Sequence, residues 1–382
     1  MMTHNAELII TISLIIIFAP FFAKILKLPT TPIEIILGSI FGYIGFLQHH
    51  YLFKLVAEFG FLYLMFIAGT EIDMKQVLKI PAKMLKLTFV YILLLYAIAA
   101  IFTLYFSLSG VFIVILPLIS VGLVTTLSKE YGKTPWLELS MTTGGIGEVV
   151  SITMLTLVSA GLEHGMSHGL LKTVVSLILF LLFMLILFRA LQLLFWWFPQ
   201  ISTVLMPHKD NKEQDIRLSM GILFILVGVM LYLHLELAFG AFLAGIFLPT
   251  FFDHKHELPQ KLSSYGFGFF IPIFFIYIGS SFDLHSLLTK GLLLEAVTIT
   301  VVMIVMRTIS ATVFIKSNGL KNSLLLALSH SMPLTILIAM VTLAYNTKTI
   351  DKISYDAFIL ASLFQVIIVM IIIKIIQMKK TA

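Results

Sequence analysis

Glu148 lies in a run of uncharged residues whose types could bind a proton or a small cation. The stretch TTGGIGEVVSITML, from Thr142 to Leu155, contains this single carboxylate, and the nearest charged residues in the sequence are Glu138 and Glu163. At ~1.5 Å per residue of helix, those neighbours are ~15 and ~22 Å away along the axis. A carboxylate inside apolar sequence is costly unless it faces protein or water, and such residues usually have a function. We expect Glu148 to bind a proton and a cation in competition, with a protonated or salt-bridged glutamate in helix packing as the alternative.

Arg307 is a second charge within an apolar run, ITVVMIVMRTISATVFI. It is the predicted charge partner of Glu148, and when Glu148 carries a proton or a cation, Arg307 must bind carbonyls or hydroxyls instead. A guanidinium does not release its proton, so the alternative for Arg307 is a purely structural brace. Arg189 is expected to extend toward a membrane interface marked by Trp196 and Trp197.

Hydroxyl side chains occur in two apolar segments that also contain proline, ILPLISVGLVTTLSKE and LALSHSMPLTILIAM. Their oxygens suit a hard monovalent ion, and the candidates include Ser128 in the first segment and Thr335 in the second. Thr125, Thr126 and Ser331 are the predicted ligands beside Glu148. The alternative for each hydroxyl is a hydrogen bond to the carbonyl four residues earlier in its own helix. His330 is a candidate pH sensor, with a hydrogen-bonded core histidine as the alternative.

Other motifs are better explained without a resident metal or cofactor. Glu163, His164 and His168 have helical spacing but fall in a predicted outer loop without a third ligand. The sequence GGIG follows no predicted strand and is typical of close helix packing, like GSIFG from Gly38 to Gly42. A second polar group is interpreted as a solvated loop and consists of Asp253, His254, His256 and Glu257. The chain contains no cysteine, which excludes disulfides and cysteine-bound metals. It also contains no HExxH or GxSxG motif, and we expect no cofactor and no enzymatic activity.

The composition is that of an integral membrane protein. Of 382 residues, 59% are hydrophobic and 12% are charged, and apolar stretches near 20 residues recur. Continuous apolar runs without alternation predict spanning helices, so the expected fold class is all-α. The net charge of +6 comes from lysines spread over short loops, which argues against a nucleic-acid partner.

Division at charges, Pro and Gly predicts thirteen spanning segments. Their approximate ranges are 6–26, 32–47, 55–70, 82–107, 111–128, 135–161, 169–198, 216–233, 235–251, 262–282, 288–316, 320–345 and 354–377. With the N-terminus outside, 18 of the 25 Lys and Arg residues fall on the cytoplasmic side and 5 on the outer side. This asymmetry follows the positive-inside rule and predicts a C-terminus in the cytoplasm.

An inverted repeat is predicted between two groups of three segments. Segments 82–161 and 288–377 start on opposite sides of the membrane, and each has a central member with a mid-span proline, Pro117 or Pro333. Interrupted helices at matching places in inverted repeats indicate a transporter's binding site near the middle of the membrane. A kinked helix satisfied by its neighbours is the alternative for either segment alone.

Six stretches, in order, resemble the bacterial monovalent cation:proton antiporter superfamily, in the branch of Kef-type potassium-efflux proteins and related sodium/proton exchangers. They are LPTTPIEIILGSIFGYIG, EFGFLYLMFIAGTEIDM, SVGLVTTLSKEYG, TTGGIGEVVSITML, LELAFGAFLAGIFLP and FFIPIFFIYIGSSFDL. The resemblance implies two crossed, broken helices, at 111–128 and 320–345 by analogy, and a homodimer. It also implies scaffold helices at 1–81 and 199–287, a linking helix at 169–198, and moving core helices at 82–168 and 288–382.

The resemblance also assigns site residues, with two departures. The family's ion-binding aspartate falls on Glu148, the polar residue before it falls on Gly147, and the basic residue of the tenth helix falls on Arg307. With one carboxylate and one permanent positive charge, we expect electroneutral exchange of Na+, Li+ or K+ for H+ across a bacterial inner membrane. The alternatives are a proton-uncoupled cation channel and a transport-inactive sensor. Any regulatory nucleotide-binding domain is expected on a separate subunit.

Overall fold

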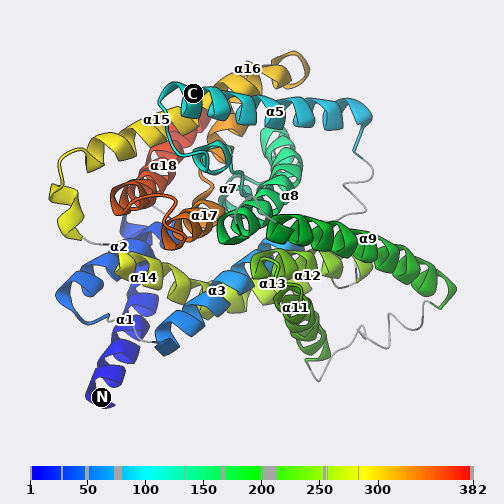
Figure 1. Cartoon of the computed structure of the whole chain (residues 1–382), viewed down its shortest axis with the longest axis horizontal. Helices are drawn as coiled ribbons and strands as arrows, with labels where there is room; N and C mark the ends of the chain where they lie inside the picture. The colour runs from blue at the N-terminus through cyan, green and yellow to red at the C-terminus, as the bar shows by residue number, and fades with distance from the viewer. Residues whose placement is uncertain are drawn as a thin grey trace. The chain divides into compact units, whose positions relative to one another are not determined.

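In the computed structural model, the described residues form helices joined by turns and short breaks, with no strand among them. Those residues are 2–26, 29–47, 51–72, 80–132, 134–164, 168–198, 200, 213–252, 255, 257–282 and 284–378. In these ranges nine helices are long and apolar enough to cross a membrane, and three shorter apolar helices accompany them. The predicted all-α membrane fold is therefore confirmed (Figure 1), while the count of thirteen crossings stays a prediction.

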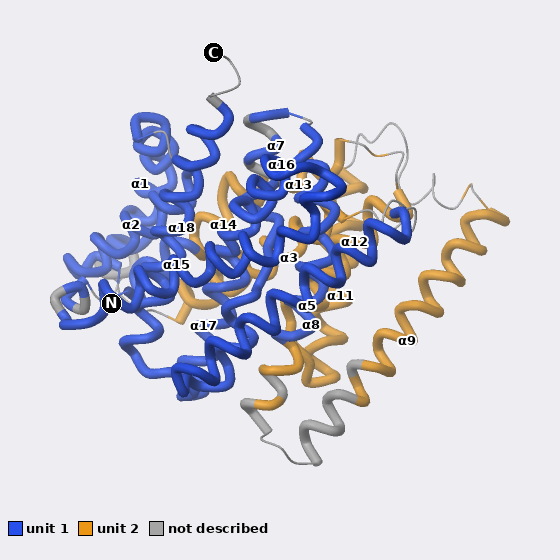
Figure 2. Tube along the Cα trace, turned by 90° about the horizontal axis from the view of Figure 1, so that it is seen from above, with its two compact units in different colours: residues 1–50, 80–155, 275–382 blue, residues 51–79, 156–274 orange. Residues whose placement is uncertain are grey.

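Unit 1 is a compact unit of residues 1–50, 80–155 and 275–382 (blue in Figure 2). It contains the α-helices α1 (Met2–Leu26), α2 (Thr30–Ile44), α5 (Ala82–Tyr105), α6 (Phe112–Ile115), α7 (Gly122–Tyr131), most of α8 (Pro135–His164), most of α14 (Ile271–Ser281), α15 (Leu292–Ser310), α16 (Ile315–His330), α17 (Leu334–Asn346) and α18 (Lys352–Met378). Two 3₁₀-helices, η2 (Leu284–Leu288) and η3 (Ala311–Phe314), belong to the same unit.

Unit 2 comprises residues 51–79 and 156–274 (orange in Figure 2). Its helices are α3 (Tyr51–Thr70), α9 (His168–Trp197), α11 (Gln214–Tyr232), α12 (Leu237–Phe251), α13 (Leu258–Tyr265) and the π-helix η1 (Gly266–Phe270). Glycines let α3 and α12 pack backbone to backbone, because a β-carbon on Gly69 would overlap the carbonyl of Phe242. The Tyr63 hydroxyl donates to the Leu262 carbonyl at 3.0 Å, beside the π-helix.

Two helices of unit 1 are interrupted where the prolines predicted it. The first runs as α6, loses helical structure over residues 116–121, and continues as α7. The second runs as α16, breaks at residues 331–333, and continues as α17. Pro117 and Pro333 lie in these breaks, and a proline has no N–H to donate to the preceding turn. The breaks leave main-chain groups without helical partners, which other side chains must satisfy.

Close packing at glycines, predicted for the GSIFG sequence, is confirmed in unit 1. A β-carbon on Gly38 would overlap the Ile276 carbonyl of α14, and one on Gly42 would lie 2.9 Å from Ser280 Cα. Helices α2 and α14 therefore pack with their backbones in contact. The two compact units do not show which helices move during transport. The assignment of scaffold, linking and core helices therefore stays a prediction.

Candidate ion-binding site

Helix α8 carries Glu148 into the interior of unit 1. The helix begins at Pro135, a residue suited to the first turn, where no helical partner exists for a backbone N–H. Glu148 is fully buried, with 0% of its surface exposed. Ser151, one turn further along α8, is also buried, and its Oγ accepts the Ile119 N–H at 2.9 Å. Helix α8 thus carries the carboxylate and also binds the backbone of the break between α6 and α7.

The carboxylate of Glu148 meets the start of α7. The Val121 N–H donates to Oε2 at 3.3 Å, and the Ser120 hydroxyl donates to Oε1 at 3.1 Å. Val121 is the N-cap residue of α7, where the helix dipole presents partial positive charge. Hydrogen bonds and a helix N-terminus therefore stabilise negative charge on this buried group.

The second interrupted helix joins this hydrogen-bond network through Thr335, which contacts Ser120. The Thr335 hydroxyl, in the first turn of α17, lies 3.1 Å from Ser120 Oγ. Since Ser120 has one hydroxyl proton and donates it to Glu148, Thr335 must be the donor between the two hydroxyls. The three side chains form a hydrogen-bonded row of oxygens that joins both breaks.

Arg307 satisfies carbonyls that both breaks leave exposed. It is fully buried, and its Nε donates to the His330 carbonyl at 2.8 Å, at the end of α16. One terminal nitrogen donates to the Leu118 carbonyl at 2.6 Å, in the unwound segment before α7. The other donates to the Met303 carbonyl at 2.8 Å, one turn earlier in its own helix. The guanidinium thus ties the two interrupted helices to α15.

The unwound segment links the two buried charges of the site. Its Leu118 carbonyl accepts from Arg307, and three residues later its Val121 N–H donates to Glu148. The cation therefore binds a carbonyl and the carboxylate binds an N–H of the same short stretch of backbone. Arg307 binds carbonyls in this structure, and both its direct charge pairing with Glu148 and a switch of partners on loading stay predictions.

His330 is held from both sides of its ring. Nε2 lies 2.9 Å from the Ser140 carbonyl, and Nδ1 lies 3.1 Å from the Tyr91 hydroxyl. A carbonyl has no proton, so Nε2 must donate, and the neutral ring then accepts the Tyr91 proton at Nδ1. The side chain is fully buried, which agrees with a hydrogen-bonded core histidine. A pH-sensing role stays a prediction.

For the remaining predicted ligands, no contact with Glu148 is described. Ser331 is buried at the end of α16, and its hydroxyl donates to the Ala327 carbonyl at 2.8 Å, the local bond that was the alternative. Thr125 and Thr126 lie in the first turns of α7, but their side chains are outside the described part of the structure. The side chains of several discounted polar residues are also outside it, namely Glu163, His164, His168, Asp253, His254 and His256. No metal-binding group of three or more His, Cys, Asp or Glu residues occurs among the residues that were described.

Ser120 and Ser151 are not in the predicted ligand set, although they contact or support the carboxylate. Ser151 carries a usable signal, because a residue three positions after Glu148 shares its helix face. Ser120 carries less, because its side chain direction depends on the path of an unwound backbone rather than on helical period. The adjacent Pro117 is the signal that residues near it leave the helix.

The absence of a side chain at Gly147 allows the unwound segment between α6 and α7 to pack against α8. A β-carbon on Gly147 would lie 2.5 Å from Ile119 Cδ1, and one on Gly144 would lie 2.7 Å from Val121 Cγ1. The unwound segment therefore packs directly on the backbone of α8. At the position where a polar residue precedes the acid in the resembled family, the Ile119 side chain fills the space.

These contacts define what the site can do chemically. One buried carboxylate and two hydroxyls can hold a proton or coordinate a small cation through oxygen, since hard cations prefer oxygen ligands. Both processes use the same carboxylate oxygens, so they exclude one another. Arg307 and the α7 N-terminus keep the site from being an isolated negative charge.

Comparison with known proteins identifies a family over almost the whole chain. The family model described as "Sodium/hydrogen exchanger, transmembrane" matches residues 10–379. In solved structures, the sodium proton antiporter MjNhaP1 from Methanocaldococcus jannaschii, determined at pH 8, superposes with a TM-score of 0.65. It shares 17% sequence identity, and the match covers 96% of each chain, so the likeness is one of fold.

Two curated relatives match a large part of the sequence. YjbQ of Bacillus subtilis (strain 168), which carries the name of a Na+/H+ antiporter, is 27% identical over 320 residues, or 75% of this chain and 49% of YjbQ. The Na+/H+ antiporter NhaS4 of Synechocystis sp. is 26% identical over 255 residues, or 61% of this chain and 59% of NhaS4. The chain spans about half the length of YjbQ.

Proposed function

The chain belongs to the sodium/hydrogen exchanger family, and on this basis we propose that it exchanges a monovalent cation for protons across a membrane. Family membership makes it a multi-pass membrane protein and a secondary transporter rather than an enzyme. Two relatives named as Na+/H+ antiporters support Na+ as the first cation to test, with Li+ and K+ as the other candidates. These matches support the family, but they do not assign the chain to its Kef-type branch.

The observation that carries the proposal is the fully buried Glu148 between two interrupted helices. Glu148 binds a proton in one half of the cycle and a cation in the other. Ser120 and Thr335 provide hydroxyl oxygens for the cation, and Thr125, Thr126 and Ser331 remain proposed contributors. Since one carboxylate serves both ligands, the cation leaves when the proton arrives, and this exclusion couples the two fluxes.

Arg307 permits exchange without net charge movement. Its positive charge is permanent, so the site with an ionised Glu148 is neutral overall, and loading with H+ or with a monovalent cation gives the same total charge. We therefore propose electroneutral exchange of one cation for one proton. Reversal-potential measurements in proteoliposomes should show no dependence of the exchange equilibrium on membrane potential, and a potential-dependent equilibrium would contradict this stoichiometry.

The transport cycle is proposed to follow alternating access. Core helices at 82–168 and 288–382 move relative to scaffold helices at 1–81 and 199–287, with 169–198 as the linking helix. A homodimer in a bacterial inner membrane, with the N-terminus outside, is proposed on the charge distribution and the family resemblance. His330 is the proposed pH-sensing residue.

The direct test of the function is dissipation of a pH gradient in proteoliposomes with the membrane potential clamped. Adding Na+ outside should dissipate the pH gradient, and adding the bulky cation N-methyl-D-glucamine should not. Cation flux that persists without a proton gradient and without proton movement would indicate a channel. No cation-dependent change in purified, folded protein would indicate a transport-inactive sensor.

A further inference from the structure

Four residues surround the ammonium group of Lys352 at the start of α18, and we propose that they form a second cation-binding site, which Lys352 occupies as a tethered cation. We name this group the Lys352 cluster. Its members are Ser281, Tyr345, Lys352, Tyr355 and Asp356, all in unit 1. The inference goes beyond the exchange proposed for Glu148, because it concerns other residues and another ligand.

The ammonium of Lys352 has two oxygen partners. Its Nζ lies 2.9 Å from Asp356 Oδ1, one turn further along α18. It also donates to the Ser281 carbonyl at the end of α14, at 3.4 Å. A carboxylate and a main-chain carbonyl are ligands that any small monovalent cation can use.

Two aromatic rings complete the surroundings of the ammonium. Nζ lies 4.8 Å from the centre of the Tyr355 ring and 5.6 Å from that of the Tyr345 ring. The rings stack on each other, with centroids 4.7 Å apart and planes at 30°. A cation within about 6 Å of a ring centre is attracted by the ring's quadrupole, and paired rings are typical of sites that bind ammonium groups.

The two charged side chains of the cluster differ in burial. The Asp356 side chain is 1% exposed, whereas that of Lys352 is 41% exposed. The carboxylate therefore stays in the interior, while the lysine stem can rotate away and remove its ammonium. This asymmetry is what a site with an exchangeable occupant requires.

Local helix electrostatics do not explain why a lysine is held there. Lys352 is the first residue of α18, where the helix dipole favours anions. A lysine four residues before an acid is also the less favourable order for a helical ion pair. By contrast, Tyr345 lies at the end of α17, where the dipole favours cations. The cluster, and not helix α18 itself, therefore stabilises the ammonium.

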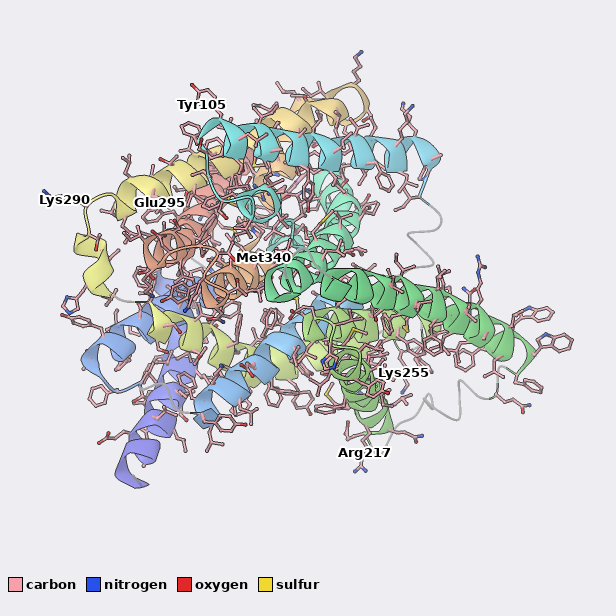
Figure 3. The ribbon with its side chains drawn as sticks, viewed as in Figure 1. Tyr105, Arg217, Lys255, Lys290, Glu295 and Met340 are labelled. Carbon is pink, nitrogen blue, oxygen red and sulfur yellow. The ribbon has the colours of Figure 1, made fainter. Side chains whose placement is uncertain are left out.

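Further acidic groups would concentrate cations near the cluster. The Ser354 hydroxyl donates to Glu295 Oε1 at 2.8 Å, and its N–H donates to Asp351 Oδ1 at 2.9 Å. Glu295 is labelled on α15 in Figure 3, and Asp351 is exposed immediately before α18. Negative charge close to an accessible site raises the local concentration of cations.

The Lys352 cluster is separate from the Glu148 site. Thr335 contacts the Glu148 site at the start of α17, and Tyr345 contacts the cluster at its end. Ten residues of continuous helix separate them, or ~15 Å. A cation that replaces the lysine would also remove the bond between α18 and the Ser281 carbonyl, so binding changes a contact between α18 and α14.

The ligand is a small ammonium-like monovalent cation, and the test uses NH₄⁺ as the probe. We would compare thermal unfolding of Glu148→Ala, Glu148→Ala with Lys352→Met, and that double variant with Asp356→Asn, in rising NH₄Cl. N-methyl-D-glucamine chloride at equal concentration controls for ionic strength. The Glu148→Ala background removes the proposed transport site, so the result does not depend on whether Glu148 transports ions.

A tethered ammonium competes at an effective concentration in the millimolar range or above, so its removal should lower the half-saturating NH₄⁺ concentration roughly tenfold or more. We expect stabilisation by NH₄⁺ in the Lys352→Met variant and its loss when Asp356→Asn is added. Equal responses with and without Asp356, or no response in the folded Lys352→Met protein, would overturn the proposal. If Lys352→Met does not remain folded, Lys352→Gln takes its place with the same expected outcomes.

Discussion

The hydroxyls of Ser120 and Thr335 lie 3.1 Å apart, although 215 positions separate the two residues in the sequence. Ser120 belongs to the break between α6 and α7, and Thr335 to the first turn after the break between α16 and α17. This contact brings both interrupted helices to Glu148, which accepts the Ser120 hydroxyl proton. A cation at Glu148 can therefore take ligands from two helices that are far apart in the chain.

Thr335→Val should weaken cation binding without disrupting packing. Valine keeps the shape of threonine and removes the hydroxyl, and one lost neutral polar interaction costs about 1 kcal/mol, or about fivefold in affinity. The KM for Na+ in proteoliposomes should rise by about this factor. Thr335→Ser, which keeps the hydroxyl, should stay near wild type. Equal KM values for the two variants would show that the hydroxyl contributes no ligand.

Arg307→Lys should destabilise the protein although it keeps the charge. A single ammonium cannot reproduce the three bonds of the guanidinium to the carbonyls of Leu118, His330 and Met303. Each buried carbonyl left without a donor costs about 1–3 kcal/mol. Thermal unfolding in detergent should shift clearly downward, and exchange should fall.

The matched control for Arg307 is Arg189→Lys, because Arg189 is exposed on α9. Its substitution should change neither thermal stability nor exchange. If Arg307→Lys proved as stable as Arg189→Lys, Arg307 would not hold the two breaks together.

Gly147→Ala should strain the contact between α8 and the first break. The added β-carbon would lie 2.5 Å from Ile119 Cδ1, and such overpacking costs about 1–3 kcal/mol. Removing that methyl group with Ile119→Val should restore part of the lost stability in the double variant. Gly228→Ala in α11 is the control, because its β-carbon would meet no atom within 4 Å. Additive losses in the double variant would contradict the contact.

The sequence predicts the fold and the burial of Glu148 and Arg307 more completely than the contacts that surround them. Long apolar runs predict helices, because lipid leaves backbone groups no other partner. Pro117 and Pro333 predict the breaks, and both breaks are present. The burial of Glu148 and Arg307 follows from their isolation within apolar runs, and both are fully buried.

The partners of those residues were harder to predict. In a helix, spacing determines which side chains share a face, but residues 116–121 are not helical. Ser120 therefore reaches Glu148 through a backbone path that no periodicity encodes. The bonds of Arg307 to Leu118 and His330 likewise depend on where two breaks meet in space. Roles for Thr125, Thr126 and Ser331 in ion binding stay predictions.

In the proposed mechanism, Glu148 carries the proton and the cation in turn. The most direct measurement is Na+-driven dissipation of a pH gradient in proteoliposomes containing wild type, Glu148→Gln or Glu138→Gln, with the membrane potential clamped. Both glutamates lie on α8, but Glu138 is exposed, so its variant controls for loss of a carboxylate on the same helix. We expect exchange in wild type and Glu138→Gln and none in folded Glu148→Gln. Retained Na+-dependent exchange in Glu148→Gln would contradict this mechanism.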